Sequence, residues 1–283
     1  MPFLVYALNI SSFHQTLTIE EITVPSYIKR IGSYAFCGCK HLKTVNFLDD
    51  SELESFGEFA FIDSAIEIFI VPSHVKEICN NAFCSCQNIQ SIIFKENSEL
   101  HTIGSEVLYN STIKYIEIPS SVREFKDDWC LETSYLDELK VIKNGEENIK
   151  IINNLLVGKS DLKSDIFDIV LFAPRNIKEA TIPSNIKQIG SSAFSKCEEL
   201  TSINFDSYSM LQKICRNAFY HSSIQIIHVP SSVNEIGPYS LSSYNLCFIN
   251  FGENSKLKIL GQASFFLSTF EEICIHRNTR KFY

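Results

Sequence analysis

An internal repeat constrains this chain of 283 residues more than any other feature. Pro25, Pro72 and Pro119 are 47 residues apart, and Pro183 and Pro230 show the same spacing. Each proline belongs to a frame that reads aliphatic-Pro-Ser, two residues, aliphatic, two residues, Ile-Gly, two residues, Ala-Phe, then Leu-x-x-Ile-x-Phe. Copies without the proline lie between them, so steps of 25 and 22 residues alternate. A repeat averaging about 23 to 24 residues predicts a solenoid of about nine stacked coils.

One copy of the frame indicates how each coil is built. The segment Leu42-x-x-Val45-x-Phe47 predicts a short strand that pairs with the strands of neighbouring coils in a parallel sheet. Proline then begins the return path, because it fixes φ and lacks an N–H group. Ile31-Gly32 is expected to form a bend. We therefore expect a β-rich curved array, with the parallel sheet on its concave face and short turns or 3-10/helical pieces on its convex face.

The excess of phenylalanine fits the same repeat. The chain has 22 Phe but only 1 Trp and 2 Met. We expect the Phe of each Ala-Phe pair to stack on the next and form a spine; these residues are Phe36, Phe61, Phe83, Phe194, Phe219 and Phe265.

The frame also divides the chain. The predicted parts are an N-terminal cap-like segment at 1–18, a first repeat block at 19–131, a non-repeat β-rich island at 132–175, a second repeat block at 176–275 and a C-terminal tail at 276–283. Ile177-x-x-Ala180-x-Ile182 predicts that strand geometry resumes where the second block begins.

The recurring frame resembles the BspA-like leucine-rich repeats, also called the Treponema pallidum type, of bacterial and protozoan surface proteins. The resemblance covers about residues 17–130 and 176–275, and it implies a leucine-rich-repeat solenoid. It further implies a role in adhesion or protein recognition at a cell surface.

Composition excludes several classes of partner. A net charge of -8 and a pI near 5.4 disfavour nucleic acid, which requires clustered Lys and Arg. The sequence contains no run of about 18 apolar residues, so we expect no insertion into a membrane. The apolar segment Met1–Ile10 lacks the basic residues that begin a signal peptide, so we expect a strand there. Two cellular locations remain as alternatives: the cell surface, which the resemblance implies, and the cytoplasm.

The ten cysteines suggest two readings. Cys37-Gly-Cys39 and Cys84-Ser-Cys86 could together form a tetrathiolate zinc site, but they lie in alternate coils, about 10 Å apart if coils stack every 4.8 Å or so. We favour buried thiols that hydrogen-bond to the turn backbone, with Ser replacing Cys in the intervening copies. No catalytic, metal-binding or cofactor-binding motif is present, and we predict a protein without enzymatic activity or cofactor.

The outward face of the predicted sheet is the candidate binding surface. The expected outward positions are Thr44, Asn46, Ile68, Ile70, Ser91, Ile93, Tyr115 and Glu117 in the first block, and Ser202, Asn204, Ile226, His228, Phe248, Asn250, Glu272 and Cys274 in the second. A solvated sheet face carries polar residues, whereas several of these are apolar. Exposed apolar patches mark protein contacts. The alternative is that β-propensity selects these residues, or that a further segment or an oligomer covers them.

Two functions follow from this face. The first is a cell-surface recognition module that binds a protein ligand, and the second is an intracellular scaffold that uses the same face for subunit contacts, with self-association left open. Asn9 and Asn110 begin two glycosylation sequons, which favour the first.

Overall fold

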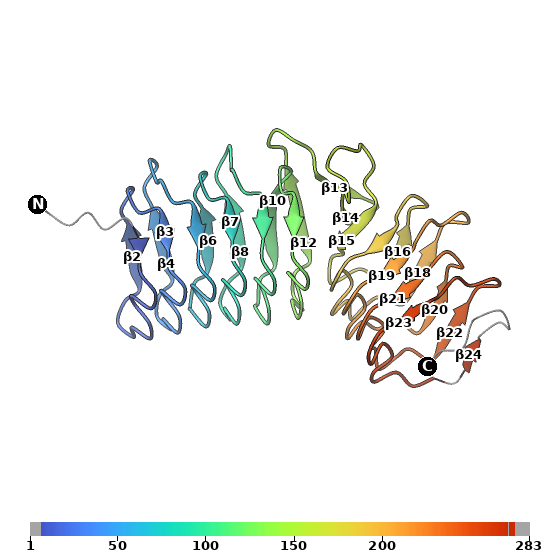
Figure 1. The fold of residues 1–283 in the computed structure, drawn as a ribbon. Helices are drawn as coiled ribbons and strands as arrows, with labels where there is room; N and C mark the ends of the chain where they lie inside the picture. The colour runs from blue at the N-terminus through green and yellow to red at the C-terminus, as the bar shows by residue number, and fades with distance from the viewer. Residues whose placement is uncertain (1–6, 271, 275–283) are drawn as a thin grey trace, which may run out of the picture. The chain divides into compact units, whose positions relative to one another are not determined.

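The computed structural model describes residues 7–270 and 272–274, and it folds into two compact units, Met1–Asn148 and Ile149–Tyr283 (Figure 1). Within the described ranges both units consist of β-strands, turns and loops, without helix. For the face opposite the long strands, short turns or helical pieces were expected, and the structure has turns there. Residues 1–6 of the expected N-terminal strand and the tail at 276–283 lie outside the described residues.

The first unit contains one four- or five-residue strand in each coil. These long strands are β2 (Glu21–Val24), β4 (Thr44–Phe47), β6 (Ile68–Val71), β8 (Ser91–Phe94), β10 (Tyr115–Pro119) and β12 (Glu138–Ile142). β2 pairs with β4, and β6, β8, β10 and β12 form a parallel four-stranded sheet. The strands coincide with the Leu-x-x-Ile-x-Phe segments, which confirms the predicted parallel sheet.

A second parallel sheet in the same unit was not predicted. Its six described strands have two residues each: β1 (Ala7–Leu8), β3 (Arg30–Ile31), β5 (Ser55–Phe56), β7 (Glu77–Ile78), β9 (Thr102–Ile103) and β11 (Glu124–Phe125). They come from the residues just before the Gly position of the frame. Each coil therefore contributes one long and one short strand, with the core between them.

Turns connect the two strands of a coil. After a long strand with proline, the proline carbonyl accepts a hydrogen bond from the N–H three residues later, as in Val75 N to Pro72 O at 3.3 Å. In coils without proline, a buried serine hydroxyl accepts from the N–H two residues later, as in Leu100 N to Ser98 Oγ at 3.3 Å. The two repeat types are thus two ways to satisfy the same turn.

The Ala-Phe segment forms a third ladder of backbone hydrogen bonds between coils. Phe36 N donates to Ala60 O at 2.8 Å, and Phe61 N donates to Ala82 O at 2.9 Å. The ladder requires two left-handed residues per coil, four positions apart, such as Phe59 and Asp63, both with φ of 56°. Left-handed backbone costs about 1–2 kcal/mol per non-glycine residue, and the ladder offsets part of that.

Glycine allows the coils to approach closely. A Cβ atom at Gly57 would lie 2.5 Å from Ser33 N and 2.7 Å from Gly32 C in the preceding coil. The expected bend at the Ile-Gly pair is therefore also the point where two coils touch through their backbones.

Phenylalanine rings fill the core of the first unit. Phe36 and Phe61 stack with centroids 5.4 Å apart, and Phe61 and Phe83 stack at 5.3 Å. Phe69, from a long strand, contacts Phe83 edge-on at 4.8 Å. The half-buried ring of Phe13 extends the stack by one coil, at 5.1 Å from Phe36. The predicted spine is present in this unit.

The second unit begins with an antiparallel hairpin and continues as a solenoid. β13 (Ile149–Ile152), β14 (Leu155–Gly158) and β15 (Ile169–Phe172) are antiparallel neighbours. β15 pairs in parallel with the short strand β17 (Gln188–Ile189), and the sheet continues in parallel through the short strands β19 (Lys213–Ile214), β21 (Glu235–Ile236) and β23 (Ile259–Leu260). The long strands are β16 (Glu179–Ile182), β18 (Ser202–Phe205), β20 (Ile226–Val229), β22 (Phe248–Phe251) and β24 (Glu272–Cys274).

The spine is shorter in this unit than predicted. Phe194 and Phe219 stack at 5.0 Å. Leu241 occupies the spine position of the next coil, so Phe265 does not stack on Phe219 and instead contacts Phe270 edge-on at 5.3 Å.

The segment 132–175, expected as one non-repeat island, has a different outline. Its residues Glu138–Ile142 form β12 and continue the parallel sheet from β10 in register, because Leu136-x-x-Leu139-x-Val141 keeps the strand frame. The boundary between the two compact units lies inside this segment, after β12, between Asn148 and Ile149.

Candidate functional site

The long strands alternate between buried and outward residues. In β6 the aromatic ring of Phe69 and the side chain of Val71 are buried, whereas Ile68 and Ile70 are 52% and 47% exposed. The same alternation holds in β4, β8 and β10, where the outward positions are Thr44, Asn46, Ser91, Ile93, Tyr115 and Glu117. The structure therefore brings the predicted outward residues of the first unit onto one face.

Four of these residues form what we call the apolar cluster: Ile68, Ile70, Ile93 and Tyr115. Ile70 and Ile93 are directly opposite each other in the parallel pairing of β6 and β8. Ser91 lies between Ile68 and Tyr115 in the adjacent row. Cross-strand neighbours of this kind are in side-chain contact range.

Fixed polar groups border the apolar cluster. On the β10 side, Tyr115 Oη donates to Glu117 Oε1 at 2.6 Å, and Lys140 Nζ lies 3.5 Å from the same carboxylate oxygen. Burial, together with the hydrogen bond to the Glu117 carboxylate, raises the pKa of Tyr115 to about 12. On the β4 side, Asn46 Nδ2 donates to Glu21 Oε1 at 2.5 Å.

The second unit has a smaller apolar pair. Ile226, 47% exposed, is opposite Phe248 in the pairing of β20 and β22, and His228 is opposite Asn250. The His228 ring lies edge-on to Phe248 at 5.8 Å. Ser202 and Asn204 lie on β18. Glu272 and Cys274 are on β24, and their side chains lie outside the described part.

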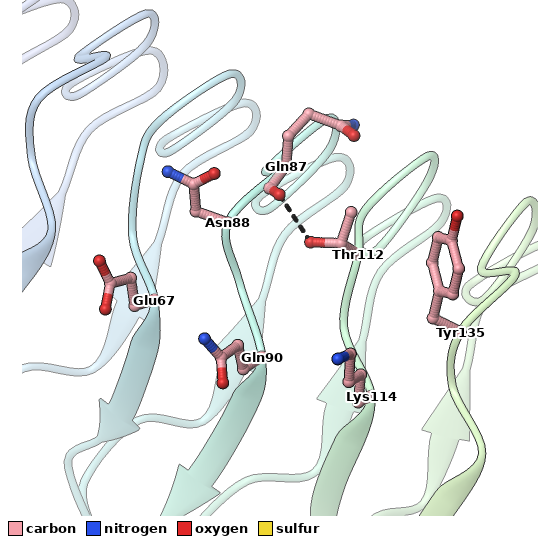
Figure 2. Close-up of a pocket in the computed structure, with 7 residues that line it drawn as sticks. All are labelled: Glu67, Gln87, Asn88, Gln90, Thr112, Lys114 and Tyr135. Atoms are coloured by element: carbon pink, nitrogen blue, oxygen red, sulfur yellow. Dashed lines mark hydrogen bonds between the residues drawn. The ribbon is translucent and has the colours of Figure 1, made fainter.

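A polar groove lies beside the apolar cluster and was missed in the sequence. It has a volume of about 560 Å³ and is lined by Glu67, Gln87, Asn88, Gln90, Thr112, Lys114 and Tyr135 (Figure 2). These residues flank the first aliphatic residue of the strand frame, just before β6, β8, β10 and β12. No motif in the sequence links these side chains, which come from four separate coils.

A family model decides the classification of the repeat. The BspA type leucine rich repeat region, in six copies, matches residues 7–136 and 166–283. The chain belongs to the BspA-type leucine-rich repeat family. The matched ranges contain all the long strands of both units except β12, together with the residues of the apolar cluster and of the groove. No curated protein matches the chain.

Solved bacterial structures resemble this BspA-type chain. A leucine-rich repeat protein from Eubacterium ventriosum is 24% identical with a TM-score of 0.63, over 89% of this chain and 58% of that one. A leucine rich cell surface protein from Faecalibacterium prausnitzii is 19% identical with a TM-score of 0.55, over 89% and 84%. The pneumococcal vaccine antigen PcpA is 20% identical with a TM-score of 0.57, over 91% and 79%. These likenesses establish the fold alone.

The frame cysteines of the BspA-type repeat hydrogen-bond to turn backbone. Cys39 Sγ donates to Phe13 O at 3.0 Å, Cys86 Sγ to Phe61 O at 3.1 Å and Cys197 Sγ to Pro174 O at 3.7 Å. Burial raises the pKa of Cys86 to about 12, so its thiol stays protonated. The favoured reading of thiols that hydrogen-bond to the turn backbone is confirmed for these three cysteines, whereas the hydroxyls of Ser111 and Ser222, which replace Cys in intervening copies, are buried without a hydrogen-bond partner among the described residues. None of the nine cysteines whose side chains the structure describes forms a disulfide.

Two further observations concern the described residues alone. They contain no group of three or more His, Cys, Asp or Glu side chains placed to hold a metal ion. They also contain no helix long and apolar enough to span a membrane. The sequon residues Asn9 and Asn110 are both exposed, and Asn110 lies in a turn with φ of 51°.

Proposed function

We propose that this BspA-type chain is a non-enzymatic protein-recognition module whose long-strand face binds a protein ligand. The apolar cluster carries the proposal. Ile68 and Ile70 are about half exposed and Ile93 is partly exposed, on a sheet whose opposite side is packed, so covering them stabilises a complex without any rearrangement of the core. Complete burial of an exposed isoleucine contributes about 1.5–3 kcal/mol, and covering the exposed half of Ile68 or Ile70 contributes about half of that.

The surrounding polar groups give the face its selectivity. The Tyr115–Glu117–Lys140 network and the Asn46–Glu21 pair place fixed charges and amides around an apolar centre. An apolar centre with a polar rim is the usual anatomy of a protein–protein interface. A matching partner has an apolar protrusion ringed by groups of complementary charge.

A peptide-display experiment tests this assignment. A phage-displayed library of linear peptides is selected on the immobilised full chain, and the enriched peptides are measured against the variants Ile70→Lys and Ile93→Lys. We expect the selected peptides to be rich in apolar residues and to lose at least tenfold in affinity to either variant.

A matched control separates this face from general charge effects. Thr181→Lys adds the same charge at an exposed outward position of β16 in the second unit, and should leave peptide affinity unchanged. Equal affinity of the selected peptides for Ile70→Lys, Ile93→Lys and the native chain contradicts the site.

We further propose that recognition occurs at a cell surface, as in an adhesin. The support is the leucine rich cell surface protein and the vaccine antigen among the similar structures, together with the two exposed sequons. Detection of a tagged chain on unpermeabilised cells, with glycan mass on Asn9 or Asn110, is the expected result. A tag reachable only after permeabilisation contradicts it.

A second candidate is an intracellular assembly scaffold that buries the same face between copies. The cysteines favour it, because none of the nine with described side chains forms a disulfide, which is typical of a reducing compartment. Sedimentation velocity of the purified chain distinguishes the two functions. A stable oligomer that Ile70→Lys dissociates supports the scaffold, and a monomer at all concentrations supports the recognition module.

A further inference from the structure

The polar groove beside the apolar cluster has two walls that follow from the repeat frame. In each coil the first aliphatic residue of the strand frame is fully buried, as are Ile66, Ile89 and Ile113. The residues before and after it point to solvent on either side. The residues after it, Glu67, Gln90 and Lys114, form one wall, and Asn88, Thr112 and Tyr135 before it form the other (Figure 2).

One contact fixes the geometry of the second wall. Thr112 Oγ1 donates to Gln87 O at 2.8 Å and lies 3.2 Å from Ile89 O, which ties two neighbouring coils together at the groove (Figure 2). The Gln87 side chain is also engaged, because its Nε2 donates to Asn110 O at 2.5 Å. Thr112 and Gln87 are therefore held in place before any ligand binds.

The other polar groups of the groove are open. In the described structure the side chains of Glu67, Asn88, Gln90 and Lys114 make no hydrogen bond or ion pair with the rest of the chain. Glu67 offers only acceptors, Lys114 only donors, and the two amides offer both. One carboxylate and one ammonium leave the groove with no net formal charge.

An aromatic ring completes the site. Tyr135 is 55% exposed and stands at the end of the groove beyond Thr112 and Lys114 (Figure 2). The face of an aromatic ring carries negative charge and attracts polarised C–H groups that lie over it. Hydroxyl groups on one side of a ligand and C–H groups on another side would satisfy both parts of this surface.

We propose that the groove binds a neutral oligosaccharide. Sugar hydroxyls both donate and accept, which matches the mixed donors and acceptors of Glu67, Asn88, Gln90 and Lys114. A sugar ring stacks its C–H face on Tyr135. Coils about 4.8 Å apart make the groove, which crosses four of them, long enough for several sugar units.

Other ligand classes fit the groove less well. A phosphate or sulfate group would meet the Glu67 carboxylate, and Lys114 is the only cation in the lining. An apolar peptide side chain would have no apolar surface to contact in the groove, because the frame residues Ile66, Ile89 and Ile113 are fully buried below the groove.

Saturation-transfer NMR with the full chain tests the proposal. The probes are maltohexaose, cellohexaose, mannohexaose and chitohexaose at about 1 mM, where a dissociation constant of about 1 mM is detectable, with a sulfated oligosaccharide as the charged comparator. We expect transfer to at least one neutral probe, and at least a tenfold loss of affinity for it in Tyr135→Ala and in Gln90→Ala.

The second unit offers a position-matched control for Gln90 and an exposed tyrosine as the control for Tyr135. Gln225 precedes β20 as Gln90 precedes β8, and Tyr208 is 89% exposed on a loop. Gln225→Ala and Tyr208→Ala should bind the probe as the native chain does, and all four variants should keep the native melting temperature, because these side chains are exposed.

Two results overturn the proposal. One is the absence of transfer to all four neutral probes. The other is binding of the sulfated probe that Lys114→Met abolishes and Tyr135→Ala leaves intact. The Ile70→Lys and Ile93→Lys variants should keep saccharide binding, so failure of this proposal and failure of protein recognition by the apolar cluster are separable.

Discussion

The guanidinium of Arg175 lies 4.6 Å from the ring centre of Phe172, in a position where Arg175 is only 2% exposed. Arg175 Nη1 donates to Ala193 O at 3.1 Å and to Ala173 O at 3.3 Å. A buried cation thus binds the turn carbonyls where the hairpin meets the first coils of the second unit. This contact joins the irregular β13–β15 segment to the regular repeat.

Replacing Arg175 should destabilise the second unit. Arg175→Ala removes the hydrogen bonds and leaves a cavity beside Phe172, with an expected loss of about 2–4 kcal/mol in the free energy of unfolding. Arg175→Met keeps most of the volume and should lose less. Urea denaturation measures both. Lys163→Ala, which removes an exposed cation of the same unit, is the control, with an expected change within about 0.5 kcal/mol.

A buried carboxylate should make stability depend on pH. Burial by itself raises the pKa of Asp168, but hydrogen bonds from Ser160 N at 2.9 Å and Oγ at 2.8 Å, and Lys187 Nζ at 3.1 Å, outweigh it and hold the pKa below its usual value. The folded state therefore favours the ionised carboxylate. This contribution is complete above the unfolded pKa of about 4, and it is lost as pH falls through the lowered folded pKa.

Asp168→Asn tests that sign. We expect a loss of about 1–3 kcal/mol at pH 7, measured by thermal denaturation. The difference from the native chain should shrink as the pH is lowered below 4 or so. Asp165→Asn, at an exposed position of the same loop, is the control. A difference that stays constant from pH 7 down to strong acid contradicts the assigned role of the Asp168 charge.

The long strands could be predicted because their pattern repeats at a fixed spacing. Leu42, Val45 and Phe47 define a strand in one coil, and the same spacing of aliphatic and aromatic residues recurs in the other coils. This regular recurrence predicts that the strands pair in parallel and in register. The strand β12 was not separated from the island because no Pro-Ser, Ile-Gly or Ala-Phe pair follows it there, although Leu139 and Val141 keep the strand spacing.

Other features leave little trace in the sequence. A two-residue strand such as Glu77–Ile78 is too short to show alternation, so the second sheet appears only when coils are stacked. The polar groove depends on variable positions in four coils. Arg175 resembles a surface residue in the sequence, and only the surrounding carbonyls account for its burial.

The phenylalanine spine should carry much of the stability of the first unit. Phe61 is fully buried and stacks on Phe36 at 5.4 Å and on Phe83 at 5.3 Å. Phe61→Ala should lose about 3–5 kcal/mol. Phe61→Leu should lose less, because Leu108 occupies the same frame position two coils later. Guanidinium denaturation followed by far-ultraviolet circular dichroism measures the loss.

The half-buried end of the spine provides the comparison. Phe13 stacks only on Phe36, so Phe13→Ala should lose clearly less than Phe61→Ala. Equal losses for the two variants would mean that the stack does not gain stability from burial between two rings.

Two glycines of the second unit should respond in opposite directions to alanine. A Cβ at Gly237 would lie 2.7 Å from Arg216 N and 2.8 Å from Cys215 C, both backbone atoms of the preceding coil. Gly237→Ala must therefore push two coils apart, and we expect a loss of about 1–3 kcal/mol. At Gly252 the nearest atom is Ser231 Cβ at 3.6 Å, an ordinary contact. Gly252→Ala should therefore be neutral or stabilise by up to about 1 kcal/mol, since alanine restricts the unfolded chain.

Thermal denaturation of the two variants side by side distinguishes close coil contact from a general need for glycine in turns. The repeat frame alone does not distinguish these two explanations, because the position that Gly237 occupies in its coil is Cys215 in the preceding coil. If coil contact sets the requirement, only Gly237→Ala lowers the melting temperature. Equal decreases for both variants would place the requirement in the local turn conformation instead.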